Sequence, residues 1–376
     1  MRVALCHKKL DRKGGTERDL FITAEGLRDL GHEVHLFCAE YDIHPPAGTF
    51  AHRVPVLSLG RTARLWSFAA WAPRVIRKYR CDVTVSFGRM FCQDVLRSGG
   101  GSHKVFLRKL AREFGPWRRL WHSMSIYHQS VLAIERQQLS AGHSKKILAV
   151  SDEVKRELIA TYSISEELIT VLYNGVDHER FHPSLCDKWR AVIRRQWSIP
   201  MDAPMVLFVG SGFRRKGLDR LLRVWDSPKL RGSYLLVVGG DSRLNSFRSR
   251  ADEVAKGRII FAGRQEHIEA YYGAADLLAL PALQEAFGNV VLEALASGLP
   301  VVVSRGVGAA ELLCVKLAQG IVEQPDNLKE VEDKLALMIN HCHAPDIRTA
   351  AREIGERYSW GNHFRRLEAC LLELCQ

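Results

Sequence analysis

Short apolar runs alternate with stretches of helical periodicity along the chain, a pattern typical of β-α units with parallel strands rather than of all-β or all-α folds. In the first half these runs predict strands at residues 2–7, 34–39, 52–57, 83–87, 147–151 and 169–173. In the second half they predict strands at residues 205–210, 234–239, 258–262, 277–280 and 301–304. Helices are expected between the strands, such as residues 17–30, which Gly31 ends.

Each series opens with a strand, a glycine-containing turn and a helix, which predicts two doubly wound, Rossmann-like halves in tandem. We therefore predict an α/β protein with an N-terminal domain at residues 1–175 and a C-terminal domain at residues 176–357. Residues 358–376 are predicted to form a helix that packs back toward the N-terminal domain. Ligands of such sheets bind at the carboxyl ends of the strands, so a site is expected in the cleft between the two domains.

Composition narrows the class of protein. An apolar fraction of 47% with 26% charged residues excludes disordered, collagen-like and disulfide-scaffold proteins. The nine cysteines form no CxxC pair and no zinc-ligand spacing, which favours a reducing cytosol. Because neither a signal peptide nor a membrane-spanning apolar run is present in the sequence, a cytoplasmic protein is expected.

The net charge of +12 is concentrated in one segment. Residues 43–134 contain 15 basic and 3 acidic residues, so their excess equals that of the whole chain. A local basic patch on a neutral body indicates one anionic surface to dock against, whereas a uniformly basic chain would indicate general binding to nucleic acid.

Two glycine-containing turns could bind phosphate. Gly14-Gly15 follows the first predicted strand and precedes a helix, where backbone amides and the helix dipole favour an anion, although a tight β-α loop is the simpler explanation of the pair. The corresponding turn of the second half, residues 211–217, contains Arg214-Arg215-Lys216. Three cations beside strand ends could clamp a diphosphate, and a solvated basic loop is the alternative.

The segment 285–300, which follows the predicted strand 277–280, contains two glutamates eight positions apart. If a helix starts near Gly288, Glu285 lies in the loop before it and Glu293 within its first turns. One carboxylate and a set of helix-start amides could then bind a phosphorylated, polyhydroxylated ligand. As the alternative, Glu293 is an ordinary exposed helix residue.

This segment, EAFGNVVLEALASGLPVV, resembles the signature of the family-four retaining glycosyltransferases of the GT-B architecture. The resemblance extends to GGTERD after the first strand, to residues 150–152, 173–177 and 210–217, and to the C-terminal YSW. More narrowly, the chain resembles the subfamily that adds the first outer-core glucose to a heptose of lipopolysaccharide.

The resemblance implies roles for individual residues. Arg215 and Lys216 would neutralise the donor diphosphate, Glu285 would contact the transferred sugar, and Glu293 would hold the nucleotide ribose. Asp19 matches an acidic position near the acceptor, and His103 resembles a histidine near the reacting sugar. A surface location is the alternative for both. The subfamily has an aspartate in the loop before His103, where this chain has glycine. The implied donor site comprises Gly14, Gly15, Gly212, Arg214, Ala286, Phe287, Gly288, Asn289, Val290 and Glu293.

The implied reaction retains the anomeric configuration through an oxocarbenium-like transition state. UDP-glucose is the expected donor, and the alternatives are other nucleotide hexoses or N-acetylhexosamines. The alternative acceptor is another glycolipid or a polysaccharide precursor. No cofactor and no metal are expected, because the cations of the clamp would stabilise the leaving group.

The basic segment itself contains a candidate membrane site. Between His103 and Met124 apolar residues recur every three or four positions, with cations largely opposite and a break at Gly115-Pro116. A core-facing helix is one interpretation, and docking on anionic lipids of the inner membrane is the other, with a lipid-linked acceptor in reach. A nucleic-acid-binding protein is the alternative class, but no motif of that class accompanies the charge. The membrane residues predicted are Lys104, Arg108, Lys109, Arg112, Trp117, Arg118, Arg119 and Trp121.

Overall fold

The computed structural model describes residues 1–11, 15–114, 124–140 and 142–375. The chain forms two compact units, Met1–Tyr173 with His363–Gln376, and Asn174–Asn362. The sequence predicts the corresponding domain boundaries after residues 175 and 357. Helix α15 (Trp360–Leu372) begins in the second unit and continues into the first.

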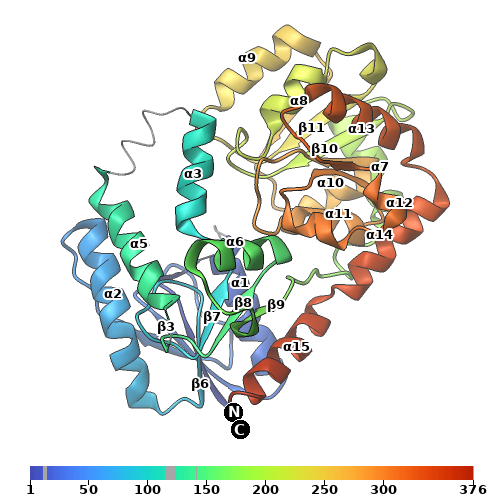
Figure 1. Cartoon of the computed structure of the whole chain (residues 1–376). Helices are drawn as coiled ribbons and strands as arrows, with labels where there is room; N and C mark the ends of the chain where they lie inside the picture. Colours follow the sequence, from blue (N-terminus) through green and yellow to red (C-terminus); the bar gives the residue numbers. More distant parts are fainter. Residues whose placement is uncertain (12–14, 115–123, 141, 376) are drawn as a thin grey trace. The chain divides into compact units, whose positions relative to one another are not determined.

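The first unit is built on a seven-stranded parallel sheet with the order β5-β3-β1-β6-β7-β8-β9. Its strands are β1 (Arg2–Cys6), β3 (Glu33–Cys38), β5 (Phe50–Arg53), β6 (Val83–Ser86), β7 (Val95–Ser98), β8 (Lys146–Ala149) and β9 (Ile169–Val171). A small parallel pair is formed by β2 (Lys9–Leu10) and β4 (Glu40–Tyr41). The helices are α1 (Gly15–Asp29), α2 (Gly60–Ile76), α3 (His103–Phe114), α5 (Ile126–Gln138) and α6 (Asp152–Tyr162), shown in Figure 1.

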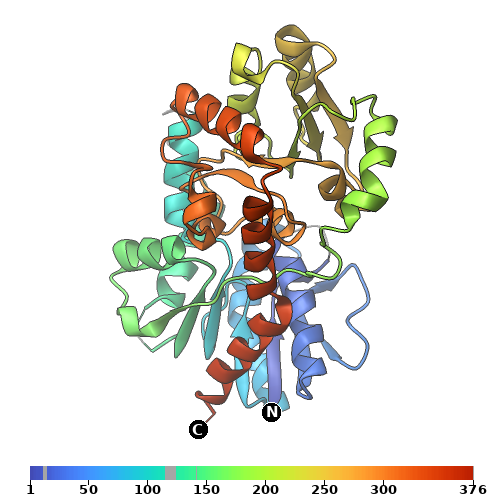
Figure 2. The same ribbon diagram turned by 90° about the vertical axis from the view of Figure 1, so that its right-hand side faces the viewer.

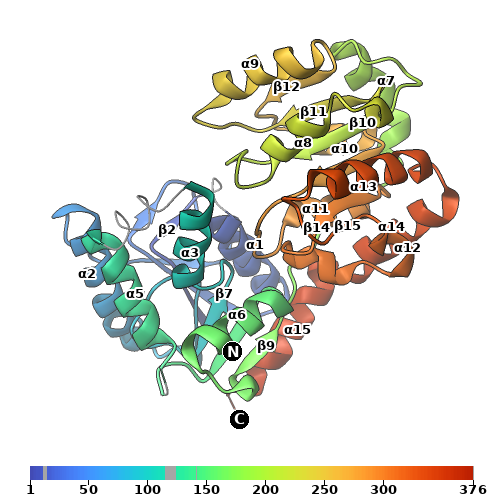
Figure 3. The same ribbon diagram turned by 45° about the horizontal axis from the view of Figure 1, so that its top comes forward.

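Alternating side chains of β1 build two cores, one on each face of this sheet. Val3 and Leu5 belong to a cluster with Leu20 and Leu27 of α1, and Leu367 and Leu371 of α15 pack into the same cluster. Figure 2 shows α15, in red, running along this unit to the C-terminus. Ala4 and Cys6 face a second cluster that includes residues of α2. Helices α2 and α5 lie side by side (Figure 3).

The second unit has a six-stranded parallel sheet with the order β12-β11-β10-β13-β14-β15. Its strands are β10 (Met205–Val209), β11 (Tyr234–Val238), β12 (Ile259–Gly263), β13 (Leu277–Leu280), β14 (Val301–Ser304) and β15 (Ile321–Val322). Its helices are α7 (Leu185–Gln196), α8 (Leu218–Val224), α9 (Leu244–Ala255), α10 (Ile268–Ala274), α11 (Asn289–Ala296), α12 (Val315–Ala318), α13 (Leu328–His341) and α14 (Pro345–Arg357).

Both sheets reverse their strand order beside the first strand, between β1 and β6 in one unit and between β10 and β13 in the other. Loops that follow the two central strands diverge there and leave room for a ligand at the carboxyl edge. The predicted α/β class and the doubly wound halves are thus confirmed, and each half has one point where a site is expected.

Some strands differ from the sequence prediction. The strand predicted at 52–57 lies at Phe50–Arg53, because Pro55 has no N–H to continue the ladder. The sequence pattern does not predict β7, since Arg97 interrupts its apolar run, nor the two-residue strands β2, β4 and β15. The C-terminal helices separate at Tyr358 and Ser359, as the sequence predicts.

Candidate active site

The reversal point of the second unit brings together two loops that are distant in sequence. Residues 210–217 follow β10, and residues 281–288 follow β13. Nη1 of Arg215 donates to Oε2 of Glu285 at 2.6 Å, and Nζ of Lys216 lies 3.6 Å from the same oxygen. We call Arg215, Lys216 and Glu285 the charged cluster. Two cations share one carboxylate here, so the cluster carries an excess positive charge at the carboxyl edge of the sheet.

Glycines make the geometry of the charged cluster possible. Gly210 has φ +146°, and a Cβ on it would lie 2.5 Å from Cδ of Lys216, so any larger residue would displace that side chain. The loop is held from the other side by Asp241, whose Oδ2 accepts the backbone N–H of Phe213 at 2.8 Å. Lys216 is therefore buried and fixed in direction, with 9% of its surface exposed.

Glu285 is ionised at neutral pH. Burial by itself would raise the pKa of this carboxyl, but the charges of Lys216 and Arg215 and their hydrogen bonds outweigh burial and lower it. A carboxylate held between two cations also holds both cation heads in place. The cluster is thus ordered before any ligand arrives, which is the arrangement that stabilises charge as it develops on a leaving group.

The loop 285–288 leads into α11, as the sequence predicts. Gly288 caps this helix with φ +91°, and the carbonyl of Phe287 accepts the N–H of Ala309 at 2.8 Å. The first amides of a helix point out of its N-terminus and favour anions. Asn289 is the first helical residue, and its Oδ1 accepts the side-chain amide of Asn174 at 2.8 Å.

Glu293 lies inside α11 and is only 5% exposed. The alternative of an exposed helix residue is therefore wrong. The hydroxyl of Tyr272 donates to Oε2 of Glu293 at 2.8 Å, which fixes the carboxylate on the inner side of the helix. Its orientation thus comes from a residue of α10 that the sequence does not single out.

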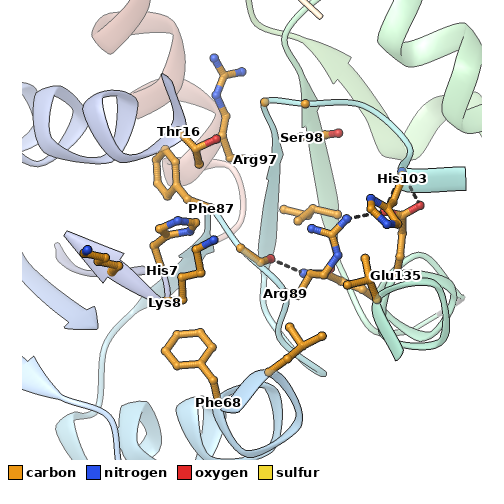
Figure 4. A pocket seen from close by; sticks show the side chains of 18 of the residues that line it. His7, Lys8, Thr16, Phe68, Phe87, Arg89, Arg97, Ser98, His103 and Glu135 are labelled. Carbon is orange, nitrogen blue, oxygen red and sulfur yellow. Dashed lines mark hydrogen bonds and ion pairs between the residues drawn. The ribbon is translucent and has the colours of Figure 1, made fainter. Parts of the chain in front are cut away.

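The first unit has a cavity of about 580 Å³ at its own reversal point (Figure 4). His7 and Lys8 follow β1, Phe87 and Arg89 follow β6, and the residues after β7 close the wall. This volume lies within the range of roughly 300–1,000 Å³ typical of small-molecule sites. We call it the unit-1 cavity.

One wall of the unit-1 cavity is the loop 99–103, which two buried carboxylates hold. Glu135 of α5 accepts the backbone N–H of His103 at 2.9 Å, the guanidinium of Arg89 at 2.7 Å and the hydroxyls of Ser102 and Tyr162. Figure 4 shows Arg89, His103 and Glu135 around this wall. Glu157 of α6 accepts the N–H of Ser102 at 2.7 Å. The glycine-rich loop is thereby fixed with its backbone toward the cavity.

Two family models match the chain. The one described as Glycosyltransferase Family 4 matches residues 13–180, and the one described as Glycosyl transferases group 1 matches residues 190–354. Together they span most of both units. The chain is a glycosyltransferase. Its two parallel-sheet units are those of the GT-B architecture, as predicted.

Individual relatives agree with this assignment. The lipopolysaccharide glucosyltransferase WaaG of Escherichia coli is 27% identical over 338 residues, which cover 89% of this chain and 88% of WaaG. A crystal structure of WaaG superposes with a TM-score of 0.80 at 25% identity, covering 98% of this chain and 99% of that one. A structure of Anabaena HepE in complex with UDP-glucose shares the fold, with a TM-score of 0.71, 18% identity, and coverage of 99% and 100%.

Some of the predicted site residues of this glycosyltransferase come together within the second unit, and others belong to the first unit. Arg215, Lys216 and Glu285 form the charged cluster, with Gly212, Arg214, Ala286 and Val290 in the same two loops and at the start of α11. Gly15 is the first residue of α1, and Gly14 lies outside the described residues. His103 lines the unit-1 cavity, and its Nε2 lies 3.1 Å from Nδ1 of His128.

Asp19 is buried in α1 and 6% exposed, so the surface alternative does not hold for it. Its Oδ2 accepts a hydrogen bond of 3.3 Å from Nε of Arg97, a residue of β7. Burial raises the pKa of Asp19, and the Arg97 guanidinium offsets this only in part. Arg97 lines the unit-1 cavity, whereas Asp19 does not line it and pairs with Arg97.

Sequence reasoning missed the pair of His7 and Glu17. Nε2 of His7 lies 3.3 Å from Oε1 of Glu17, and both residues line the unit-1 cavity. His7 is the last residue of the first predicted strand, and this position at the reversal point was the available signal. Glu135 and Glu157 carried no comparable signal, because helical carboxylates are usually solvent-exposed.

The predicted membrane residues are only partly described. Lys104 and Arg108 are exposed on α3, whereas Lys109 lies 3.9 Å from Glu153 and 3.7 Å from Glu157 and faces α6. Phe106, one of the apolar residues that recur along this segment, is 39% exposed, whereas Val105 is buried. The described part does not include the side chain of Arg112, nor the residues Trp117, Arg118, Arg119 and Trp121.

None of the helices in the described ranges is long and apolar enough to cross a membrane. In the same ranges, no group of three or more His, Cys, Asp or Glu side chains could hold a metal ion.

Proposed function

We propose that this glycosyltransferase transfers glucose from UDP-glucose to a heptose of the lipopolysaccharide core, or to a similar lipid-linked saccharide, with retention of configuration. The observation that carries the proposal is the charged cluster of Arg215, Lys216 and Glu285 at the reversal point of the second unit. The similarity to WaaG over 89% of this chain supports the choice of sugar and acceptor. HepE, which was crystallised with UDP-glucose, has the same fold.

In this proposal the second unit binds the donor. Lys216 and Arg215 contact the diphosphate and stabilise the charge that develops on it as the glycosidic bond breaks. Glu285 positions both cations and accepts hydrogen bonds from hydroxyls of the transferred sugar. Glu293, oriented by Tyr272, accepts those of the ribose. The amides at the start of α11 add donors for phosphate.

The first unit binds the acceptor in the unit-1 cavity, where the loop 99–103 offers its backbone and His103 its ring. The acceptor hydroxyl attacks the anomeric carbon from the face that the diphosphate leaves, so that the configuration is kept. No metal is required in this scheme, since the cluster supplies the positive charge. The exposed Lys104 and Arg108 of α3 dock the enzyme peripherally on anionic lipids of the cytoplasmic membrane, close to a lipid-linked acceptor.

The test is a transfer assay with the full chain, UDP-glucose and lipopolysaccharide truncated at the heptose region. Mass spectrometry should show the addition of one hexose, and the anomeric coupling constant in the NMR spectrum should show the α configuration of the donor. UDP-galactose and UDP-N-acetylglucosamine serve as competing donors. A product with the opposite configuration, or faster transfer from another sugar, would contradict the proposed donor or stereochemistry.

The absence of a nucleic-acid partner is part of the proposal and needs its own measurement. A filter-binding titration with duplex DNA and with RNA at physiological salt should give no tight binding. Tight binding that weakens steeply with salt would favour the nucleic-acid class instead.

A further inference from the structure

The unit-1 cavity has more cations than carboxylates on its wall. Six of its lining residues are lysines or arginines and three are glutamates. The basic residues are Lys8, Lys9, Arg61, Arg64, Arg89 and Arg97, and the acidic residues are Glu17, Glu40 and Glu135. A surplus of this kind attracts an anion only where it is not already matched by nearby carboxylates outside the lining.

Four of the six cations are matched. Nζ of Lys9 lies 2.7 Å from a carboxylate oxygen of Asp42, and Arg89 contacts Glu135 at 2.7 Å. Arg64 is paired with Glu40, and Arg97 with Asp19. The third lining glutamate, Glu17, is occupied by His7. These contacts account for every carboxylate of the lining.

Lys8 and Arg61 differ from the other four cations in their pairing. Neither has a carboxylate within ion-pair distance in the described ranges of the chain, and both are exposed at the cavity. The guanidinium carbon of Arg61 lies 4.3 Å from the ring centroid of Tyr127, another lining residue. This cation-π contact orders the side chain in advance, so less entropy is lost when a ligand binds it.

The helix that carries Arg61 adds charge of the same sign. Helix α2 has 17 residues, no acidic residue in its first turn and no side-chain hydrogen bond at its N-cap. Its macrodipole therefore places uncompensated positive charge next to Arg61. The N-terminus of α1, by contrast, carries Glu17, and that of α3 is capped by Glu135.

An independent observation indicates that a polar ligand belongs in the same cavity. His7 is 5% exposed, and its Nδ1 is buried without a hydrogen-bond partner among the described residues. A Cβ on Gly88 would lie 2.9 Å from this nitrogen, so a residue larger than glycine would crowd the ring. An unsatisfied buried nitrogen on a cavity wall is stabilised by a polar group of a ligand or its water.

We propose that the unit-1 cavity binds a saccharide that carries an anionic group, phosphate or carboxylate, and that Arg61 and Lys8 hold that group. The proposal rests on the proposed function for the identity of the bound saccharide as the acceptor. It adds that this acceptor is selected by its charge. Arg61 offers a planar pair of N–H donors that fits either anion, and Lys8 adds a point charge on the wall of the same cavity.

The experiment is calorimetric titration of the full chain, without donor, with heptose, heptose phosphate and a uronic acid. The wild type should bind one of the anionic sugars about tenfold more tightly than neutral heptose, as expected for charge-assisted hydrogen bonds. Arg61→Ala and Lys8→Ala should reduce this preference, and the double variant should abolish it. Arg61→Gln, which keeps a planar side chain over Tyr127 without the charge, should behave like Arg61→Ala and serves if the alanine variant is unstable.

The matched control is Arg74→Ala, an exposed arginine on the same helix and outside the cavity, which should keep the full preference. Equal binding of neutral and anionic sugars by the wild type, or a preference that survives in the double variant, would overturn the proposal. The transfer assay is separate: if no glucose is transferred to any acceptor, the proposed function fails, while the titration still decides the role of Arg61 and Lys8.

Discussion

Arg215 and Glu285 stand 70 residues apart in the chain, yet their side chains form an ion pair of 2.6 Å. Each follows one of the two strands at which the sheet of the second unit reverses its order. The contact is therefore a consequence of topology: the loops after β10 and β13 have to meet at this edge. Lys216 joins the same carboxylate and is the buried member of the cluster.

Lys216→Ala should reduce kcat about 10²- to 10³-fold, because it removes charge stabilisation that is realised mainly in the transition state. The KM for the donor should change less. The measurement is steady-state transfer from UDP-glucose, with Lys256→Ala, an exposed lysine after α9, as the control. A rise in KM with kcat unchanged would show that Lys216 only binds the ground state.

Glu17 makes the stability of the first unit depend on pH. The hydrogen bond from His7 lowers the pKa of Glu17 from 4.5 to about 2 despite partial burial. Because the pKa is depressed in the folded state, this contribution is complete above about pH 4.5 and is lost as the pH falls toward 2. Glu17→Gln should cost about 1–3 kcal/mol at pH 7 and should flatten the stability profile in that window.

Urea unfolding at a series of pH values measures this effect. Glu25→Gln, on the same helix and half-buried, provides the control. If the glutamine variant at position 17 loses stability between pH 4.5 and 2 as steeply as the wild type, Glu17 is not the group responsible.

Glu135→Ala should lower the free energy of unfolding by about 2–4 kcal/mol, since it leaves several buried donors without an acceptor. It should also raise the KM for the acceptor, because the loop 99–103 loses its anchor. Unfolding and transfer kinetics of the same preparations check both effects. Glu167→Ala, at an exposed position, should change neither. Loss of stability with an unchanged acceptor KM would separate the loop from acceptor binding.

Two neighbouring glycines of the loop 99–103 should respond differently to substitution. A Cβ on Gly100 meets nothing within 4 Å, so Gly100→Val should fold normally but extend into the space by the cavity and weaken acceptor binding. Gly101 has φ +71°, and its Cβ would lie 2.8 Å from Oε1 of Glu157, so Gly101→Ala should lower the melting temperature. Equal melting temperatures for the two variants would contradict this account of the loop.

Helix α3 should bind anionic vesicles through Lys104 and Arg108. Alanine at both positions should weaken co-sedimentation with vesicles containing phosphatidylglycerol, by about 1 kcal/mol for each cation removed. Lys109→Ala should have a smaller effect, because Lys109 is turned toward Glu153 and Glu157. Sedimentation that does not respond to salt or to lipid charge would exclude electrostatic docking.

Much of the fold is visible in the sequence, because the alternation of apolar runs and helical stretches is a local property. Four predicted strands of the second unit begin at the predicted residue, and the helix after Gly288 starts where the glycine places it. Glycine-rich turns after first strands are equally local, so Arg215 and Lys216 could be proposed without coordinates.

The partners of these residues were decided by the tertiary structure. Arg97 interrupts an apolar run in the sequence, and in the structure it pairs with Asp19 in the core. Glu135 has the sequence context of a solvated helix residue, whereas in the structure it holds the loop 99–103. A charged residue is stable inside a protein only if a distant residue pairs with it. Local pattern therefore determined the elements of this glycosyltransferase, whereas the packing of distant segments determined which of its charges are matched and which are left for a ligand.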